Sequence, residues 1–92
     1  MNWGIIDFKF KKEIQSLPIQ CMKKYAVFKY VVGTSGLCGL DKYPGYKLES
    51  LKGRLKGIYS VRLNIAYRLL FRVDKGKRII EIQEISKHEY NQ

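Results

Sequence analysis

The chain has 92 residues, of which 46% are hydrophobic, and a formal net charge of +10. This length supports one hydrophobic core and excludes a second sizeable one, so residues 1–92 are expected to form a single domain. The hydrophobic fraction excludes a disordered chain, and no apolar run is long enough to span a membrane. Lysines and an aspartate occupy residues 1–13, where a signal peptide would be apolar, so the cytoplasm is the expected location.

The first elements expected along the chain are a strand and a helix. Residues 3–6 are predicted to form a short opening strand. Asp7 is expected to cap the helix that follows, in which Phe10, Ile14 and Leu17 recur at helical spacing. Pro18 ends this helix or starts the next one.

A second helix is predicted from Pro18 to about residue 32, because one apolar stripe recurs at i, i+4, i+7 and i+11. The stripe consists of Cys21, Tyr25, Phe28 and Val32. Gly33 and Gly36 are expected to stop the helix. The two helices then form an antiparallel hairpin, and their aromatic residues are expected in the core.

The rest of the chain is predicted to form a loop and then a meander of strands. Turn-forming residues dominate 34–46, and strands are expected at about 47–52, 58–65, 67–73 and 78–85. A turn at 74–77 joins the last two strands. The expected fold class is α+β: an N-terminal strand and a two-helix hairpin pack on one face of a mostly antiparallel, roughly four-stranded twisted sheet. The other face of the sheet stays open.

Arginines interrupt two strands that otherwise have the pattern of core strands. In residues 58–65, Tyr59, Val61 and Leu63 alternate with Ser60, Arg62 and Asn64. In residues 67–73, Arg68 and Arg72 fall on the face opposite Tyr67, Leu69, Phe71 and Val73. Two neighbouring strands that place guanidinium groups on one face are suited to hold a planar or tetrahedral anion.

The positive charge is concentrated in residues 42–78. This segment has eleven Lys or Arg and only two acids, Glu49 and Asp74, so nine of the ten net charges lie there. Such a field favours nucleic acid, an anionic membrane or an acidic protein as the partner; the alternative is a solvated lysine-rich surface. Cys21 and Cys38 lack metal-ligand spacing and only one histidine is present, so no metal site is expected.

Three stretches resemble the RelE/ParE superfamily of small bacterial toxins. They are GYKLESLKGRLKGIYSVRL at 45–63, YRLLFRV at 67–73 and KHEY at 87–90. The S-x-R-L-N and Tyr-Arg motifs resemble the HigB-like branch, whereas Glu49 and the terminal His-x-Tyr motif resemble the YoeB-like branch. The resemblance covers about the carboxy-terminal half of the chain and leaves the branch open.

The resemblance implies a RelE-like fold and a toxin of a type II toxin–antitoxin system. The ribonuclease members enter the ribosomal A site and cut messenger RNA through attack of the neighbouring 2′-hydroxyl, without a metal ion or other cofactor. The implied partners are the ribosome with its message and a cognate antitoxin, a small protein for which a DNA-binding helix-turn-helix is one option. No membrane partner is expected.

The resemblance assigns five residues to the chemistry, and each has a simpler alternative. Arg68 matches the arginine over the phosphate and Arg62 would be the second phosphate contact; the alternatives are a salt bridge from Arg68 to Glu81 or Glu84, and a solvated Arg62. Glu49 matches a proposed general base, or it neutralises Lys47 or Lys52.

The last two assignments fall on the carboxy-terminal tail. His88 matches the general acid, and its imidazole titrates in the range that such a role needs. Tyr90 would stack on a base. The alternatives are an ordinary surface histidine and a tyrosine that only pins the tail onto the sheet.

Five further cations are expected to bind RNA without taking part in the chemistry. They are Lys47, Lys52, Arg54, Lys56 and Arg72. Two other functions remain open at this point. One is a ParE-like inhibitor of DNA gyrase that cuts no RNA, and the other is a plain RNA-binding or structural domain.

Overall fold

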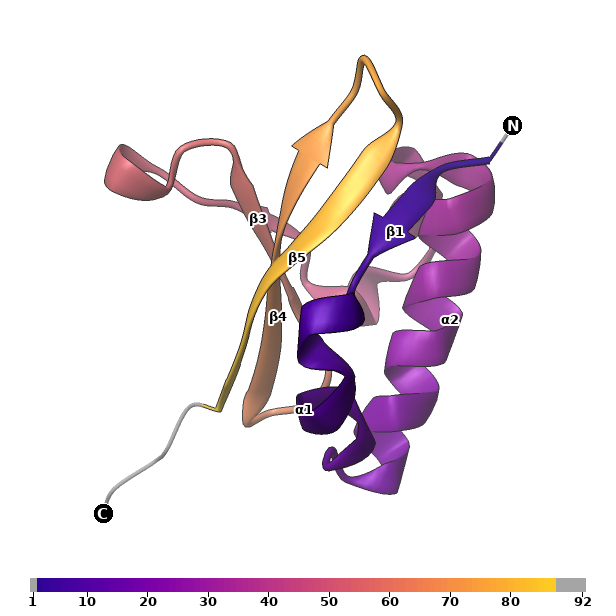
Figure 1. Ribbon diagram of the computed structural model, residues 1–92, viewed down its shortest axis with the longest axis vertical. Coiled ribbons are helices and arrows are strands. Elements are labelled where there is room, and N and C mark those ends of the chain that lie inside the picture. Colours follow the sequence, from indigo (N-terminus) through magenta and orange to yellow (C-terminus); the bar gives the residue numbers. More distant parts are fainter. Residues whose placement is uncertain (1, 88–92) are drawn as a thin grey trace.

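A computed structural model describes residues 2–87, which have an α+β fold (Figure 1). The chain begins with β1 (Gly4–Ile6), a 3-10 turn (Phe8–Phe10), α1 (Lys11–Gln15) and the long helix α2 (Ile19–Ser35). Two more 3-10 turns follow, Leu37–Lys42 and Pro44–Tyr46. The remaining elements are β2 (Glu49–Ser50), a 3-10 turn (Gly53–Leu55), β3 (Ile58–Arg62), β4 (Tyr67–Asp74) and β5 (Ile79–Lys87).

The sheet has five strands in the order β1-β5-β4-β3-β2. The pairs β2–β3, β3–β4 and β4–β5 are antiparallel, and β1 joins the edge of β5 in parallel. The predicted α+β class, with the helices on one face of a mostly antiparallel sheet, is therefore confirmed. The opening strand provides the fifth strand of this sheet. No helix within residues 2–87 has the length and apolar character needed to cross a membrane.

The core lies between α2 and the sheet. Phe28 of α2 and Phe71 of β4 are fully buried, and their ring centroids lie 5.3 Å apart. The predicted helix stripe (Cys21, Tyr25, Phe28, Val32) and the predicted inward residues of the strands (Val61, Leu63, Leu69, Phe71) are all buried. Because side chains alternate along a strand, burial of one set fixes the opposite set on the other face. We call the sheet face opposite α2 the open face.

Asp7 precedes the 3-10 turn at Phe8–Phe10, but its side chain makes no capping hydrogen bond, contrary to the prediction. Its carboxylate instead accepts hydrogen bonds from the Tyr25 hydroxyl at 2.7 Å and the Lys29 ammonium at 3.3 Å, and so ties the N-terminal segment to α2. Burial raises the pKa of Asp7, but these hydrogen bonds and the charge of Lys29 outweigh it, so its pKa lies below the ordinary value. Burial and the neighbouring carboxylate raise the pKa of Tyr25.

The second helix ends later than predicted, because only one of the two candidate glycines has a stop conformation. Gly33 lies inside α2, whereas Gly36 follows it with φ of +72°. A Cβ atom at Gly36 would lie 2.9 Å from the indole nitrogen of Trp3, so both the backbone angle and the space require glycine. The predicted loop at 34–46 is also more regular than expected, since it contains two 3-10 turns.

Candidate phosphate site on the open face

Two arginines lie directly opposite each other on the open face. Arg62 ends β3 and pairs with Arg68 of β4, and Arg68 pairs in turn with Ser86 of β5. Directly opposed residues of antiparallel strands point to the same face with their Cβ atoms about 5 Å apart. The two side chains carry like charges and start from neighbouring positions on one face, so this row favours a bound anion.

The turn between β3 and β4 sets this opposition. The Asn64 side-chain oxygen accepts hydrogen bonds from the backbone N–H groups of Ala66 (2.8 Å) and Tyr67 (2.6 Å). Asn64 was expected to continue the polar face of a strand to residue 65; β3 instead ends at Arg62. An Asn that bonds to the backbone two or three residues ahead stabilises a tight turn. Asn64 thereby fixes the register in which Arg62 faces Arg68.

Arg68 has no acidic partner among residues 2–87. Its Nε atom is shielded from solvent and lacks a hydrogen-bond partner there, and no ion pair joins Arg68 to an acid in that part of the chain. The suggested salt bridges to Glu81 or Glu84 are therefore wrong. The register explains this, because Glu84 lies opposite Leu70 and Glu81 opposite Arg72, with a β-bulge between the two pairs.

Glu49 lies one row away from the arginines on the same face. It pairs with Ser60 of β3, which pairs with Leu70 of β4. Glu49 is exposed, and neither Lys47 nor Lys52 forms an ion pair with it in the described part of the chain. The carboxylate is thus available for other chemistry.

A basic hollow of about 340 Å³ adjoins Arg62 at the carboxy-terminal end of β3. Lys24, Lys47 and Asn64 line it together with Arg62. Lys47 adopts a left-handed backbone angle, with φ of +51°, which costs a non-glycine residue about 1 kcal/mol. Lys24 was not among the residues expected to bind RNA. It is distant in sequence and sits on a helix, so no local pattern links it to Arg62.

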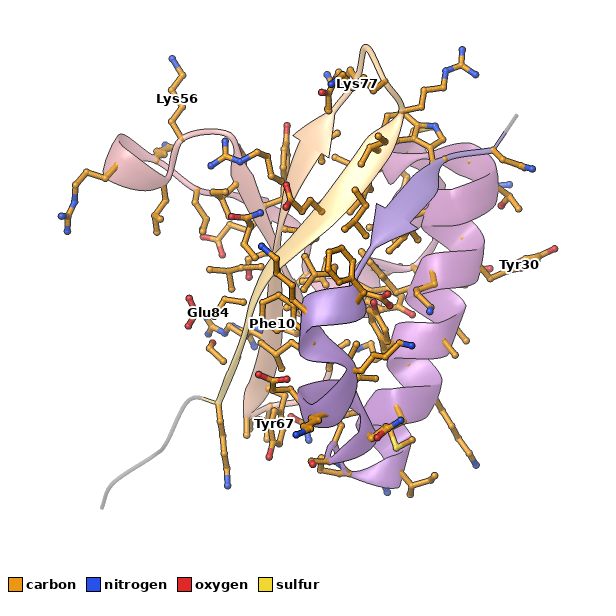
Figure 2. All side chains as sticks on the ribbon, in the orientation of Figure 1. Phe10, Tyr30, Lys56, Tyr67, Lys77 and Glu84 are labelled. Carbon is orange, nitrogen blue, oxygen red and sulfur yellow. The ribbon has the colours of Figure 1, made fainter. Side chains whose placement is uncertain are left out.

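The other expected RNA-binding residues occupy two places. Lys52, Arg54 and Lys56 belong to residues 51–57, which form an arm that extends away from the sheet (Figure 1), and Lys56 points outward from it (Figure 2). All three cations are exposed. Arg72 lies on the open face between Ile58 and Glu81, one row beyond the row of Glu49.

His88 and Tyr90 lie outside the described residues. The strand that leads to them runs beside β4, since Ser86 is opposite Arg68 and Lys87 is opposite Tyr67. Their roles remain predictions. Within residues 2–87, no group of three or more His, Cys, Asp and Glu side chains could hold a metal ion.

The open face thus carries two opposed, half-buried arginines, Arg62 and Arg68. A sequence model of one toxin family, described as RelE-like toxin of type II toxin-antitoxin system HigB, matches residues 7–84. The chain belongs to this HigB-like toxin family. The predicted superfamily is confirmed, and the branch that the motifs left open is the HigB-like one. No curated protein sequence matches this HigB-like toxin.

Solved structures agree with the fold of this HigB-like toxin. A chain of the archaeal RelE–RelB complex from Pyrococcus horikoshii OT3 is 20% identical with a TM-score of 0.74, over 99% of this chain and 100% of that chain. A chain of the heterotetrameric YoeB–YefM toxin–antitoxin complex from Staphylococcus aureus is 28% identical with a TM-score of 0.67, over 98% and 100%. The YoeB dimer from the same organism gives 26% and 0.60, over 98% and 100%.

Proposed function

We propose that this HigB-like toxin is a ribosome-dependent endoribonuclease that cuts messenger RNA and so inhibits translation. The observation that carries the proposal is the opposition of Arg62 and Arg68, with the Nε atom of Arg68 buried and unpaired among the described residues. A surface salt-bridge network would pair these cations with Glu81 and Glu84. Arg62 and Arg68 are not paired with these glutamates, so they suit a scissile phosphate, whose charge increases in the transition state.

The proposed reaction starts from the ribose 2′-hydroxyl next to the scissile phosphate. A base removes the hydroxyl proton, the 2′-oxygen forms a bond to phosphorus, and the bond from phosphorus to the 5′-oxygen breaks. An acid gives a proton to that 5′-oxygen, so the products are a 2′,3′-cyclic phosphate and a 5′-hydroxyl. The nucleophile belongs to the RNA itself, so the proposal assigns no step to a metal ion.

The roles follow the positions on the open face. Arg62 and Arg68 would stabilise the negative charge of the five-coordinate phosphorus. Glu49, in the adjacent row, would act as the base. His88 would act as the acid and Tyr90 would stack on a base of the message; both assignments rest on the sequence.

The ribosome and its message would be held mainly by charge. Lys52, Arg54 and Lys56 on the arm, Lys47 beside the hollow and Arg72 on the open face offer cations over a wide surface. Phosphate contacts of this kind supply affinity and salt dependence but little chemistry. Their spread beyond the Arg62–Arg68 row is consistent with a large RNA partner.

An antitoxin is the proposed protein partner. The chain belongs to a type II toxin–antitoxin family, and the similar chains from Staphylococcus aureus and Pyrococcus horikoshii come from complexes with YefM and RelB. A protein with a net charge of +10 attracts an acidic partner. We expect a small antitoxin gene beside the toxin gene, and one that carries a DNA-binding helix-turn-helix is consistent with this family.

The test is cleavage of a translated message by purified toxin, with and without ribosomes. Wild type should cut only when ribosomes are present and should leave a 5′-hydroxyl end. Arg68→Ala should cut about 100-fold to 1000-fold more slowly, as expected for loss of a group that stabilises transition-state charge. Ile79→Val, a mild change on β5 away from Arg68, is the matched control and should cut normally.

Two outcomes would contradict the proposal. One is an intact message at every codon in an assay where another ribosome-dependent toxin cuts. The other is growth arrest with accumulated gyrase–DNA cleavage complexes that persists in Arg68→Ala, which would indicate the ParE-like activity instead.

A further inference from the structure

The outward face of α2 carries apolar side chains where a solvated helix is usually polar. One row of exposed positions on the helix recurs at helical spacing: Ile19, Lys23, Val27, Tyr30 and Thr34. Ile19 is 62% exposed, Val27 45% and Tyr30 73%. Figure 2 shows Tyr30 pointing away from the body of the protein. The opposite side of the same helix is buried in the core, so these residues are not needed to pack α2 on the sheet.

The segment 42–46 forms a second wall beside this stripe. Between them lie two open hollows, of about 560 Å³ and about 460 Å³, which share Lys42 and Tyr43 in their linings and so adjoin each other as a shallow depression along the helix. We call it the α2 groove. Val27, Tyr43 and Pro44 line its apolar part. It runs along α2 from Lys23 to Thr34, a length of about 17 Å at the rise of an α-helix.

Lysines surround the apolar part of the groove. Lys23, Lys24 and Lys42 all line it, and α2 itself contains no Asp or Glu. A second copy of this chain would bring another net charge of +10 to the same place. An RNA strand would also leave the aliphatic surface of Val27 and Pro44 uncovered, whereas the apolar side chains of a protein segment would cover it.

We propose that the α2 groove binds an acidic amphipathic segment of a partner protein. Apolar side chains of the segment would contact Val27 and Tyr43, and its carboxylates would lie beside the three lysines. The proposal rests on the proposed toxin–antitoxin function for the identity of this partner, the antitoxin. It assigns the partner a surface on the helical side of the protein, separate from the Arg62–Arg68 row.

The groove also leads toward the candidate site. Lys24 and Gly45 line both the α2 groove and the basic hollow that contains Arg62. A segment that extends beyond the groove at this end would therefore reach the Arg62 hollow. This continuity gives the partner a physical route to oppose RNA binding.

The first test places a negative charge in the groove. Val27→Glu changes an exposed helix position, so the fold should survive, and the new carboxylate would repel an acidic segment. We expect the affinity for the protein encoded beside the toxin gene to fall by about tenfold or more, since the substitution removes an apolar contact and its carboxylate would take up the lysines that the partner's carboxylates need. Phe8→Glu is the matched control, because Phe8 is exposed and apolar but lies in the N-terminal 3-10 turn; its affinity should not change.

Both variants are measured by calorimetry in an Arg68→Ala background, so the result does not depend on whether the toxin cuts RNA. Equal affinity of the Val27→Glu and Phe8→Glu proteins, or no binding of the neighbouring protein at all, would overturn the proposal. The cleavage assay above tests the proposed function separately.

The second test needs no natural partner. The probe is a synthetic helix of about 16 residues with Leu at i, i+3, i+4 and i+7 and Glu elsewhere, long enough to cover the groove. Added to isotope-labelled Arg68→Ala protein, it should shift amide resonances of residues 23–34 and 42–46. A scrambled peptide of the same composition should shift them far less. Shifts confined to the open face, or self-association of the toxin that Val27→Glu abolishes, would overturn the proposal.

Discussion

The two faces of the sheet carry opposite kinds of contact on the same pair of strands. On the helix-covered face, Val61 of β3 and Leu69 and Phe71 of β4 are fully buried. On the open face, Arg62 and Arg68 oppose each other, and the Nε atom of Arg68 lacks a partner among the described residues. A single β3–β4 pairing register determines both the buried apolar contacts and the opposition of the two arginines. Stability and activity should therefore respond to substitutions on different faces.

The magnitudes explain why the open face can hold two like charges together. Burial of one Leu or Phe side chain contributes about 1.5–3 kcal/mol, whereas two like charges across a strand pair cost less than about 1 kcal/mol. The apolar face therefore decides the register, and the repulsion on the other face is tolerated. Such a balance is expected where a site is organised before its ligand arrives.

The largest expected effect is on the covered face. Phe71→Ala should lower the free energy of unfolding by about 3–5 kcal/mol, because it leaves a cavity against Phe28 and removes a fully buried ring. Urea unfolding followed by circular dichroism would measure it. Arg72→Ala, the next residue on the open face, is the control and should change stability by less than about 1 kcal/mol. Similar losses for both variants would refute the separation of the faces.

The second prediction concerns the centre of the open face. Arg68→Met should leave the free energy of unfolding unchanged or raise it by up to about 1 kcal/mol, since it removes a buried unpaired donor and a repulsion with Arg62. Cleavage of the message should nevertheless fall about 100-fold or more. A stability loss above about 2 kcal/mol would show that Arg68 supports the fold, and the comparison of the faces would then fail.

The third prediction tests an ionic contact on the helical side. Asp7 has a lowered pKa in the fold, so its contribution to stability is complete above the ordinary carboxyl pKa and is lost as the pH falls through the lowered value. Asp7→Asn should cost about 1–2 kcal/mol at neutral pH and should flatten the loss of stability that wild type shows as the pH falls below the ordinary carboxyl pKa. Unfolding curves at several pH values measure this. Parallel curves for wild type and variant would argue against the contact with Tyr25 and Lys29.

The smallest effect per residue is expected on the arm. Replacing Lys52, Arg54 and Lys56 by Gln should weaken binding to ribosomes and reduce the dependence of binding on salt by about 0.7–0.9 logarithmic units per lost phosphate contact. Lys9, Lys11 and Lys12, three exposed lysines near α1, provide the matched control when replaced by Gln. Filter binding at several salt concentrations would compare the two proteins. An equal change in both would mean that net charge, and not the arm, determines affinity.

The faces of β3 and β4 could be predicted from the sequence because side chains alternate with a period of two. Val61 and Leu69 were assigned to the core and Arg62 and Arg68 to the other side, and the structure confirms all four. The buried stripe of α2 was predicted for the same kind of reason, with a period of 3.6. The two periods identify which segments are helices and which are strands, and the order of these segments predicts the α+β class.

Other features could not be read from local patterns. A β-bulge at Leu70 and Phe71 shifts β5 so that Glu84 lies opposite Leu70, and no alternation rule reveals such a shift. The role of Asp7 was also misjudged, since an acid before a helix looks like a cap until its distant partner Tyr25 is placed. His88 and Tyr90 stay predictions from the carboxy-terminal motif.

The sequence by itself determined which side chains share a strand face or a helix face, where the charge is concentrated and which toxin superfamily the motifs resemble. Only the tertiary structure decided that Arg62 faces Arg68, that Lys24 of α2 joins the hollow at Arg62, and that α2 and residues 42–46 line a shallow groove. The physical reason is that a periodic pattern reports the environment of one element. Contacts between distant elements depend on how these elements pack, and packing is a property of the whole chain.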